Sequence, residues 1–294
     1  MLIAFKIKLA IACAAGLAGP LAVAPLLNGP HDPIFRDRQA VVELRPGSVT
    51  YRLAGDFTHA GRLAAAPLIS LHMERPLVIM THQVSSSDYQ SCVDDGACRA
   101  LDRDVAIATD RPAVKVNWHD ADDYAEWLSR KTGERHRLPT DEEWAFAAGS
   151  KFKDDGLPID EKNPSRQWIA RYERESERGP SDDVTRAFGG YGVNENGLFD
   201  VSGNVWEWTS TCFERIVLND ARDIVSKNPN CGVRIAEGQH RAYVTDFIRD
   251  ARAGGCAVGI PPSNLGFRLV IERDRWPGVR HLVRGAASRL KAFL

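Results

Sequence analysis

The sequence lacks an excess of charge of either sign. It has 38 lysines and arginines against 39 aspartates and glutamates, a formal net charge of -1. Because a nucleic-acid-binding protein needs a basic face, this balance argues against nucleic acid as a partner. Beyond the first 30 residues, no hydrophobic run is long enough to cross a membrane. The sequence also has no internal repeat and no low-complexity segment, which excludes repeat and compositionally biased architectures.

Common catalytic signatures are also missing. The eight histidines form no HxxH or HxxxH pair, and there is no Ser-His-Asp order, phosphate-binding loop or nucleotide fingerprint. A two-histidine, one-carboxylate iron site would have to be assembled from distant residues. The sequence therefore leaves the question of iron open and excludes the common hydrolase and nucleotide-binding patterns.

The first 30 residues differ from the rest. Lys6 and Lys8 precede an apolar run, 9–24, that ends in the small-residue triplet Ala-Val-Ala. A positive region followed by such a run is typical of a secretory signal peptide. Pro25 is a poor residue after a cleavage point, so an uncleaved membrane anchor is the alternative for residues 1–30. Either interpretation predicts an exported, periplasmic protein that touches the membrane only through this anchor, if it is retained.

Export would place the cysteines in an oxidising compartment. Cys92 and Cys98 flank the short segment Val-Asp-Asp-Gly-Ala, a turn that can bring their Cβ atoms to disulfide distance. Cys256 is the odd cysteine among those after the leader, and it is either a buried inert thiol or a reactive one.

Hydrophobic periodicity predicts a mixed α+β fold. Alternation predicts two strand pairs, one within 41–53 around the Pro46-Gly47 turn and one within 67–82. Helices are expected within 83–93, over 120–131 with Gly133 as the stop, and after the Thr140 capping box. The polar segments 151–186 and 213–231 read as surface excursions.

The segment 196–208 combines two glycines, two asparagines, two tryptophans and two carboxylates. Asp200 and Glu207 lie near its ends, and the carbonyls of Gly203 and Val205 lie between them. Carboxylate and carbonyl oxygens are the ligands that calcium takes. The alternative is a tight turn with Trp206 and Trp208 packed in the core.

Three segments carry a family resemblance. Gly197-Leu-Phe-Asp-Val-Ser-Gly-Asn-Val-Trp-Glu-Trp208, Arg137-Leu-Pro-Thr-Asp-Glu-Glu-Trp-Ala-Phe-Ala-Ala148 and Asn264-Leu-Gly-Phe-Arg268 resemble signatures of the formylglycine-generating enzyme (sulfatase-modifying factor) family. The resemblance covers Val41 to Arg273. It implies one sulfatase-modifying-factor-like domain at 41–273, related to C-type lectins and rich in irregular structure, with a basic tail at 274–294.

The resemblance also implies two stabilising features. Asp200, Gly203, Val205 and Glu207 match the family's structural calcium site. Many exported relatives have a cysteine pair near the positions of Cys212 and Cys231, so a second disulfide is expected there.

The family's catalytic chemistry has no counterpart in this sequence. Formylglycine-generating enzymes use two cysteines, five apart and about twenty residues before the last signature, to bind copper(I). The corresponding stretch, 237–252, contains no cysteine, so we expect neither copper nor formylglycine-generating activity. His240 and Asp246 in this stretch, with Cys256 downstream, are weak catalytic candidates. The alternative is a solvated strand and turn held by Asp–Arg pairs.

These observations lead to one main function and two alternatives. We expect an exported accessory or maturation protein that acts on or beside a periplasmic protein such as a metalloenzyme. The segments 92–98 and 247–252 look most like the NirV group, which is associated with nitrite reductase. The alternatives are a metal-dependent oxidoreductase acting on a periplasmic protein or small molecule, and a calcium-stabilised binding module without catalysis.

Overall fold

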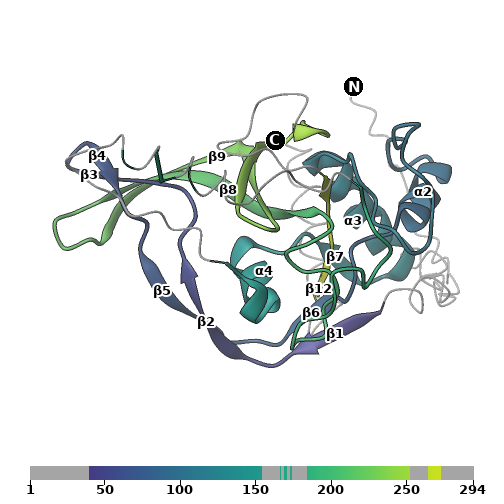
Figure 1. Ribbon diagram of the computed structural model, residues 1–294, viewed down its shortest axis with the longest axis horizontal. Helices are drawn as coiled ribbons and strands as arrows, with labels where there is room; N and C mark the ends of the chain where they lie inside the picture. Colours follow the sequence, from purple (N-terminus) through teal and green to yellow (C-terminus); the bar gives the residue numbers. More distant parts are fainter. Residues whose placement is uncertain are drawn as a thin grey trace, which may run out of the picture.

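The computed structural model describes residues 40–153, 166, 169–170, 173, 184–251 and 264–272. The structure is α+β, as predicted, with its helices packed among a set of curled sheets (Figure 1). The helices are α2 (Ser86–Asp94), α3 (Trp118–Thr132) and α4 (Asp141–Ala148), followed by a short 3-10 turn, η1 (Gly149–Lys151).

The strands form three sheets. The first has the order β1 (Val41–Leu44), β6 (Leu77–Met80), β12 (Val270–Glu272) and β7 (Arg135–Arg137). The second has the order β10 (Ala242–Thr245), β9 (Ile224–Glu237), β8 (Trp206–Leu218), β3 (Asp56–His59) and β4 (Arg62–Ala64), with β11 (Leu265–Gly266) parallel to β8. The third pairs β2 (Gly47–Arg52) with β5 (Leu68–Met73).

Local sequence signals explain the helices. Ser85 caps α2 by accepting a hydrogen bond from the Asp88 N–H. Reciprocal capping boxes open the other two helices, with Asn117 as the cap of α3 and Thr140 as the cap of α4. Gly133 ends α3 in the left-handed conformation, where a side chain would be strained. The predicted helices are confirmed, and α3 begins slightly earlier than its periodicity indicated.

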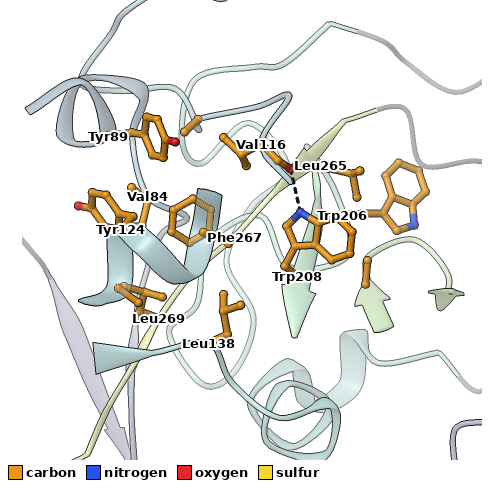
Figure 2. Packing of buried hydrophobic residues seen from close by; sticks show 14 of the residues in the cluster. Val84, Tyr89, Val116, Tyr124, Leu138, Trp206, Trp208, Leu265, Phe267 and Leu269 are labelled. Carbon is orange, nitrogen blue, oxygen red and sulfur yellow. Dashed lines mark hydrogen bonds between the residues drawn. The ribbon is translucent and has the colours of Figure 1, made fainter. Parts of the chain in front are cut away.

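The largest core cluster lies between α2, α3 and the second sheet (Figure 2). Tyr89 and Tyr124 stack with ring centroids 5.8 Å apart, and Phe267 meets the Tyr124 ring edge-on at 5.4 Å. Trp208 is fully buried, and its indole N–H donates to the Val116 carbonyl at 2.9 Å. This packing fixes the signature segments against the helices, so the loop that precedes Trp208 has one defined position.

Two expectations about strands need correction. The strands around Pro46-Gly47 exist, but they do not pair with each other, because β1 pairs with β6 and β2 with β5. The segment 213–231, expected only as a polar excursion, consists of paired strands. It is the outer part of the β8–β9 hairpin, which extends away from the helices toward β3 and β4 (Figure 1). The outer part of β9 is exposed, whereas Ile216 and Leu218 of β8 are buried in a small cluster with Phe57 and Ala64.

Several predictions concern residues outside the described part of the chain. These are the leader or anchor at 1–30, most of the loop 151–186, Cys256, and the tail 274–294. Among the described residues, no helix is long and apolar enough to span a membrane.

Candidate functional site

The loop before β8 owes its shape to left-handed backbone positions. Asp200, Ser202 and Asn204 have φ values of 56°, 60° and 62°. The Asp200 side chain stabilises this path because its two carboxylate oxygens accept the N–H groups of Gly189 and Tyr191, each at 2.7 Å. The loop is therefore held from inside by a buried carboxylate.

Gly203 lies under an aromatic ring. A Cβ atom on this residue would lie 2.6 Å from the ring of Tyr191, closer than any real contact allows. The need for glycine at this position therefore follows from packing, independently of any role of its carbonyl oxygen.

Glu207 is the centre of a buried polar network. Its Oε2 accepts from Arg268 Nε at 2.6 Å and from Trp144 Nε1 at 2.8 Å. Its Oε1 accepts from Arg268 Nη2 and from Gln83 Nε2, each at 2.7 Å. The carboxylate thus receives four hydrogen bonds, which occupy its four lone-pair positions. The network joins the three signature segments, since Trp144, Glu207 and Arg268 come one from each.

One of the four predicted calcium ligands, Glu207, has no oxygen lone pair free for a calcium ion in this arrangement. A calcium ligand needs free oxygen lone pairs directed at a shared position. Glu207 has none left, because a bidentate arginine, an indole and an amide surround it. We therefore assign the stability of this loop to its own hydrogen bonds and derive no role for calcium.

The candidate residues of the stretch 237–252 have separate partners. His240 is buried, with its ring edge-on to Trp206 at 5.2 Å, and its carbonyl accepts the Trp206 indole N–H. Asp246 instead pairs with the exposed His119, Oδ2 to Nε2 at 3.1 Å. Cys256 lies outside the described residues. In the part of the chain that the structure describes, no group of three or more His, Cys, Asp and Glu side chains is arranged to hold a metal.

Asp–Arg pairs do hold part of this stretch, as the alternative interpretation expected. Arg249 Nε lies 2.8 Å from Asp120 Oδ2, and Arg249 Nη1 lies 2.8 Å from Asp102 Oδ1. These contacts tie the segment after β10 to the first turn of α3 and to the loop after α2. The arginine thereby has a structural role that is independent of any chemistry.

The sequence interpretation missed a buried ionic cluster at the start of α4. Arg241 Nε lies 2.7 Å from Glu237 Oε1, and Arg241 Nη2 lies 3.2 Å from Asp141 Oδ2. The hydroxyl of Tyr51 also donates to Asp141 Oδ2. Asp141 and Glu237 have side chains that are 0% and 2% exposed. Three elements, β2, α4 and β9, and the segment before β10 meet in this cluster, and it has no local sequence motif.

Two neighbouring carboxylates compete for one positive charge here. Burial raises the pKa of Glu237 well above its ordinary value, and the nearby Asp141 carboxylate adds to this effect. Asp141 Oδ1 is buried and accepts no hydrogen bond from any described donor. A proton on Glu237 supplies a donor beside Asp141, so the pair is best described as one carboxyl and one carboxylate.

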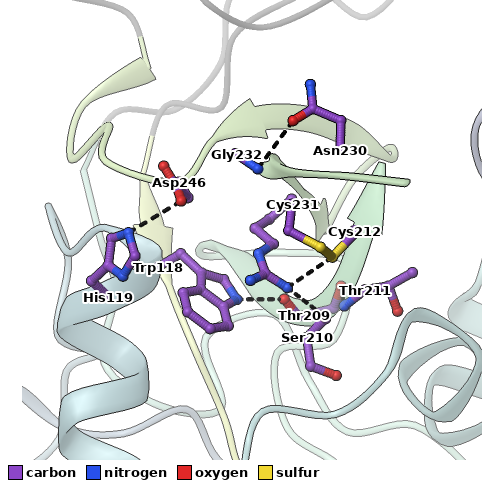
Figure 3. Close-up of a disulfide and its surroundings, with 11 residues drawn as sticks. Trp118, His119, Thr209, Ser210, Thr211, Cys212, Asn230, Cys231, Gly232 and Asp246 are labelled. Atoms are coloured by element: carbon purple, nitrogen blue, oxygen red, sulfur yellow. Dashed lines mark hydrogen bonds and ion pairs between the residues drawn. A yellow bond between two sulfur atoms is a disulfide. The ribbon is translucent and has the colours of Figure 1, made fainter. Parts of the chain in front are cut away.

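Both expected disulfides are present. Cys92 bonds to Cys98, and Cys212 bonds to Cys231 across the β8–β9 hairpin. The second disulfide lies beside Trp118 and Ser210 (Figure 3). Arg234 completes these surroundings, with its guanidinium 3.8 Å from the Trp118 ring centroid and its Nη1 donating to the Ser210 carbonyl at 2.8 Å.

Comparison with known proteins gives one family and several relatives. The inactive C-alpha-formylglycine-generating enzyme 2 of Bos taurus is 30% identical over 179 residues, which cover 57% of this chain and 52% of the relative. The formylglycine-generating enzyme of Streptomyces coelicolor is 27% identical over 185 residues, covering 60% of this chain and 57% of the relative. The alignments thus span little more than half of each of these relatives.

A longer alignment involves the formylglycine-generating enzyme of Thermomonospora curvata, 27% identical over 256 residues and covering 82% of each chain. Among solved structures, that of PvdO from Pseudomonas aeruginosa is similar, with 21% identity and a TM-score of 0.49, covering 79% of this chain and 94% of that one. The model of the sulfatase-modifying factor enzyme 1-like domain matches residues 31–273, and the chain belongs to this family.

Proposed function

We propose that the protein is an exported accessory or maturation factor that acts on or beside another periplasmic protein, without converting a sulfatase cysteine to formylglycine. The observation that carries this proposal is the state of its cysteines. Four of the six cysteines are bonded in the two disulfides. The family's chemistry needs two thiolates to hold copper(I). The two cysteines that remain are Cys13, in the predicted leader, and Cys256.

Two further observations support the proposal. Two disulfides in one chain are typical of proteins that fold outside the cytoplasm. The polar side chains at the centre of the signature segments have structural partners, with Glu207 bound to Arg268 and Trp144. The family resemblance therefore accounts for the fold, and the reaction has to be tested separately. The NirV-like placement stays a prediction of the sequence.

The test is a direct assay for formylglycine formation. The disulfide-bonded protein is incubated with copper(I), oxygen and a peptide that contains a sulfatase-type cysteine, and the peptide is analysed by mass spectrometry. The formylglycine-generating enzyme of Streptomyces coelicolor serves as the positive control. We expect an unchanged peptide and no stoichiometric copper.

A Cys256→Ser variant completes the experiment. We expect the wild-type protein and this variant to give the same result, because one thiol cannot form the two-thiolate site. Formation of the aldehyde by the wild type, with loss in the variant, would refute the proposal and identify Cys256 as a catalytic residue.

A further inference from the structure

The Cys212–Cys231 disulfide lies on the surface of the β8–β9 hairpin. Cys231 belongs to the run of exposed residues that forms the outer part of β9, whereas Cys212 is half-buried. The two strands are irregular here, since their register shifts on both sides of Cys212. Cys231 is therefore the more accessible of the two cysteines for an attacking thiolate.

Arg234 is the immediate neighbour of the half-buried sulfur. Cys212 and Arg234 are cross-strand partners in the β8–β9 ladder. This pairing brings Arg234 Nη1 to 3.2 Å from Cys212 Sγ. The face of the guanidinium rests on Trp118, whose own N–H donates to the Thr209 carbonyl at 2.9 Å. The arginine is thus fixed in place from two sides.

The charge of Arg234 has no close counter-ion among the described residues. The nearest acidic groups include Asp246, which is engaged with His119, and Asp122. The Nε atom of Arg234 is buried and donates to no described acceptor. Burial lowers the pKa of Arg234 from its ordinary value, but an arginine of this kind still carries its charge at neutral pH. A cation held against a sulfur is the arrangement that stabilises a thiolate.

The other disulfide lacks these features. Cys92 is fully buried in the main core cluster, and Cys98 packs against the same cluster. Among the described residues, no arginine or lysine donates a hydrogen bond to either of its sulfurs. The chain therefore contains a matched internal control for the reactivity of its exposed disulfide.

We propose that Cys212–Cys231 is a redox-active disulfide that oxidises a dithiol of another extracytoplasmic protein, with Arg234 as the residue that stabilises the leaving thiolate of Cys212. A partner thiolate attacks Cys231 Sγ, the Cys212–Cys231 bond breaks, and Cys212 leaves as a thiolate beside Arg234. The second partner thiol, deprotonated, then attacks the mixed disulfide and releases Cys231. Two electrons and two protons pass from the partner dithiol to Cys212 and Cys231, and the partner gains a disulfide. This inference goes beyond the proposed function and rests on it only for the export of the protein.

The experiment measures which disulfide exchanges first. The native, oxidised protein is mixed with a limiting amount of a synthetic two-cysteine peptide, quenched with iodoacetamide and mapped by mass spectrometry. We expect alkylated Cys212 and Cys231, and oxidised peptide, to appear at least about tenfold faster than alkylated Cys92 and Cys98, because an exposed disulfide with a stabilised leaving group exchanges faster. Equal rates, or faster exchange at Cys92–Cys98, would overturn the proposal.

Variants of Arg234 test the role of the charge. Arg234→Gln should slow the exchange by roughly three- to tenfold, because the pKa of the leaving thiol rises when its cation is lost. Arg234→Lys should recover part of the rate, since it restores a positive charge. If Arg234→Gln exchanges as fast as the wild type, Arg234 has no role in the reaction.

If Arg234→Gln does not fold, the pH dependence of cysteine alkylation in the wild-type protein tests the same assignment. In the reduced protein, alkylation of Cys212 should reach half its maximal rate at a pH below about 8.5, the ordinary pKa of a cysteine thiol. Cys92 should show no such shift. A midpoint for Cys212 at or above the ordinary value would overturn the assignment.

Discussion

Arg268 and Glu207 form an ion pair that is almost entirely removed from water, with side chains that are 0% and 1% exposed. Two hydrogen bonds of 2.6 and 2.7 Å make the pair bidentate. Arg268 also donates to the carbonyls of Thr81 and Phe199, at 3.1 and 2.9 Å. The last signature segment is thereby tied to the loop after β6 and to the loop before β8.

The first prediction concerns this ion pair. Arg268→Met should lower the free energy of unfolding by about 3–5 kcal/mol, because it leaves the Glu207 carboxylate buried without its counter-ion. Arg268→Lys should recover only part of the loss, since an ammonium group cannot make both bonds of the guanidinium. Urea denaturation followed by circular dichroism measures both variants. The exposed pair Arg130–Glu126 is the control, and Arg130→Gln should cost less than about 0.5 kcal/mol. A loss for Arg268→Met no larger than this control would contradict the account.

The second prediction concerns calcium. Because the Glu207 oxygens are occupied by donors, we expect the thermal midpoint to be the same in excess chelator and in millimolar calcium chloride. Elemental analysis of the purified protein should find no stoichiometric calcium at this loop. If calcium raises the midpoint and Asp200→Ala removes the effect, the ion is a ligand of the loop, and the hydrogen-bond account of Glu207 is wrong.

Much of the fold was predictable from the sequence because its signals are local. The three described helices begin at capping residues three positions from their bonding partners, and a glycine ends α3. The three signature segments were likewise recognisable as short contiguous strings. Signals of this kind do not depend on the conformation of distant parts of the chain.

The misses come from long-range pairing. Leu44 lies opposite Leu77 and Tyr51 opposite Ile69, although alternation alone suggested that the strands around Pro46-Gly47 belong together. The β8–β9 hairpin escaped detection because the outer part of β9 faces water and shows no apolar alternation. The Asp141–Glu237 pair was also invisible, since Asp141 reads as an ordinary first-turn acid of α4. Glu207 and Arg268 are 61 positions apart in the chain, so only the structure could show that Arg268 occupies the oxygens of a predicted calcium ligand.

The third prediction concerns Trp208. Trp208→Phe should cost about 1–3 kcal/mol, because it leaves the Val116 carbonyl without the donor that now lies 2.9 Å away in a buried position. Trp208→Ala should cost more, about 3–5 kcal/mol, because it adds a cavity to the lost hydrogen bond. Chemical denaturation measures both. Phe247 is 61% exposed, so Phe247→Ala is the matched aromatic control and should change stability by less than about 0.5 kcal/mol. Equal effects at the two sites would show that Trp208 does not anchor the core.

The last prediction is that the free energy of unfolding depends on pH because Glu237 titrates. Its folded-state pKa is raised above the unfolded value, first by burial and then by Asp141. The folded protein therefore holds a proton that the unfolded chain releases. The resulting stability is fully present below the unfolded pKa, near 4.5, and is lost as the pH rises toward the folded pKa.

Glu237→Gln should remove this dependence. The amide oxygen can still accept from Arg241, and the amide N–H₂ can donate toward Asp141 as the protonated carboxyl does, but the group no longer titrates. The wild type should lose up to about 1.4 kcal/mol per pH unit in the titrating range relative to the variant. Denaturant titrations at pH values from acid to alkaline, with the exposed Glu126→Gln as the control, measure the difference between the two curves. Parallel curves for the wild type and Glu237→Gln would show that the Asp141–Glu237 pair shares no proton.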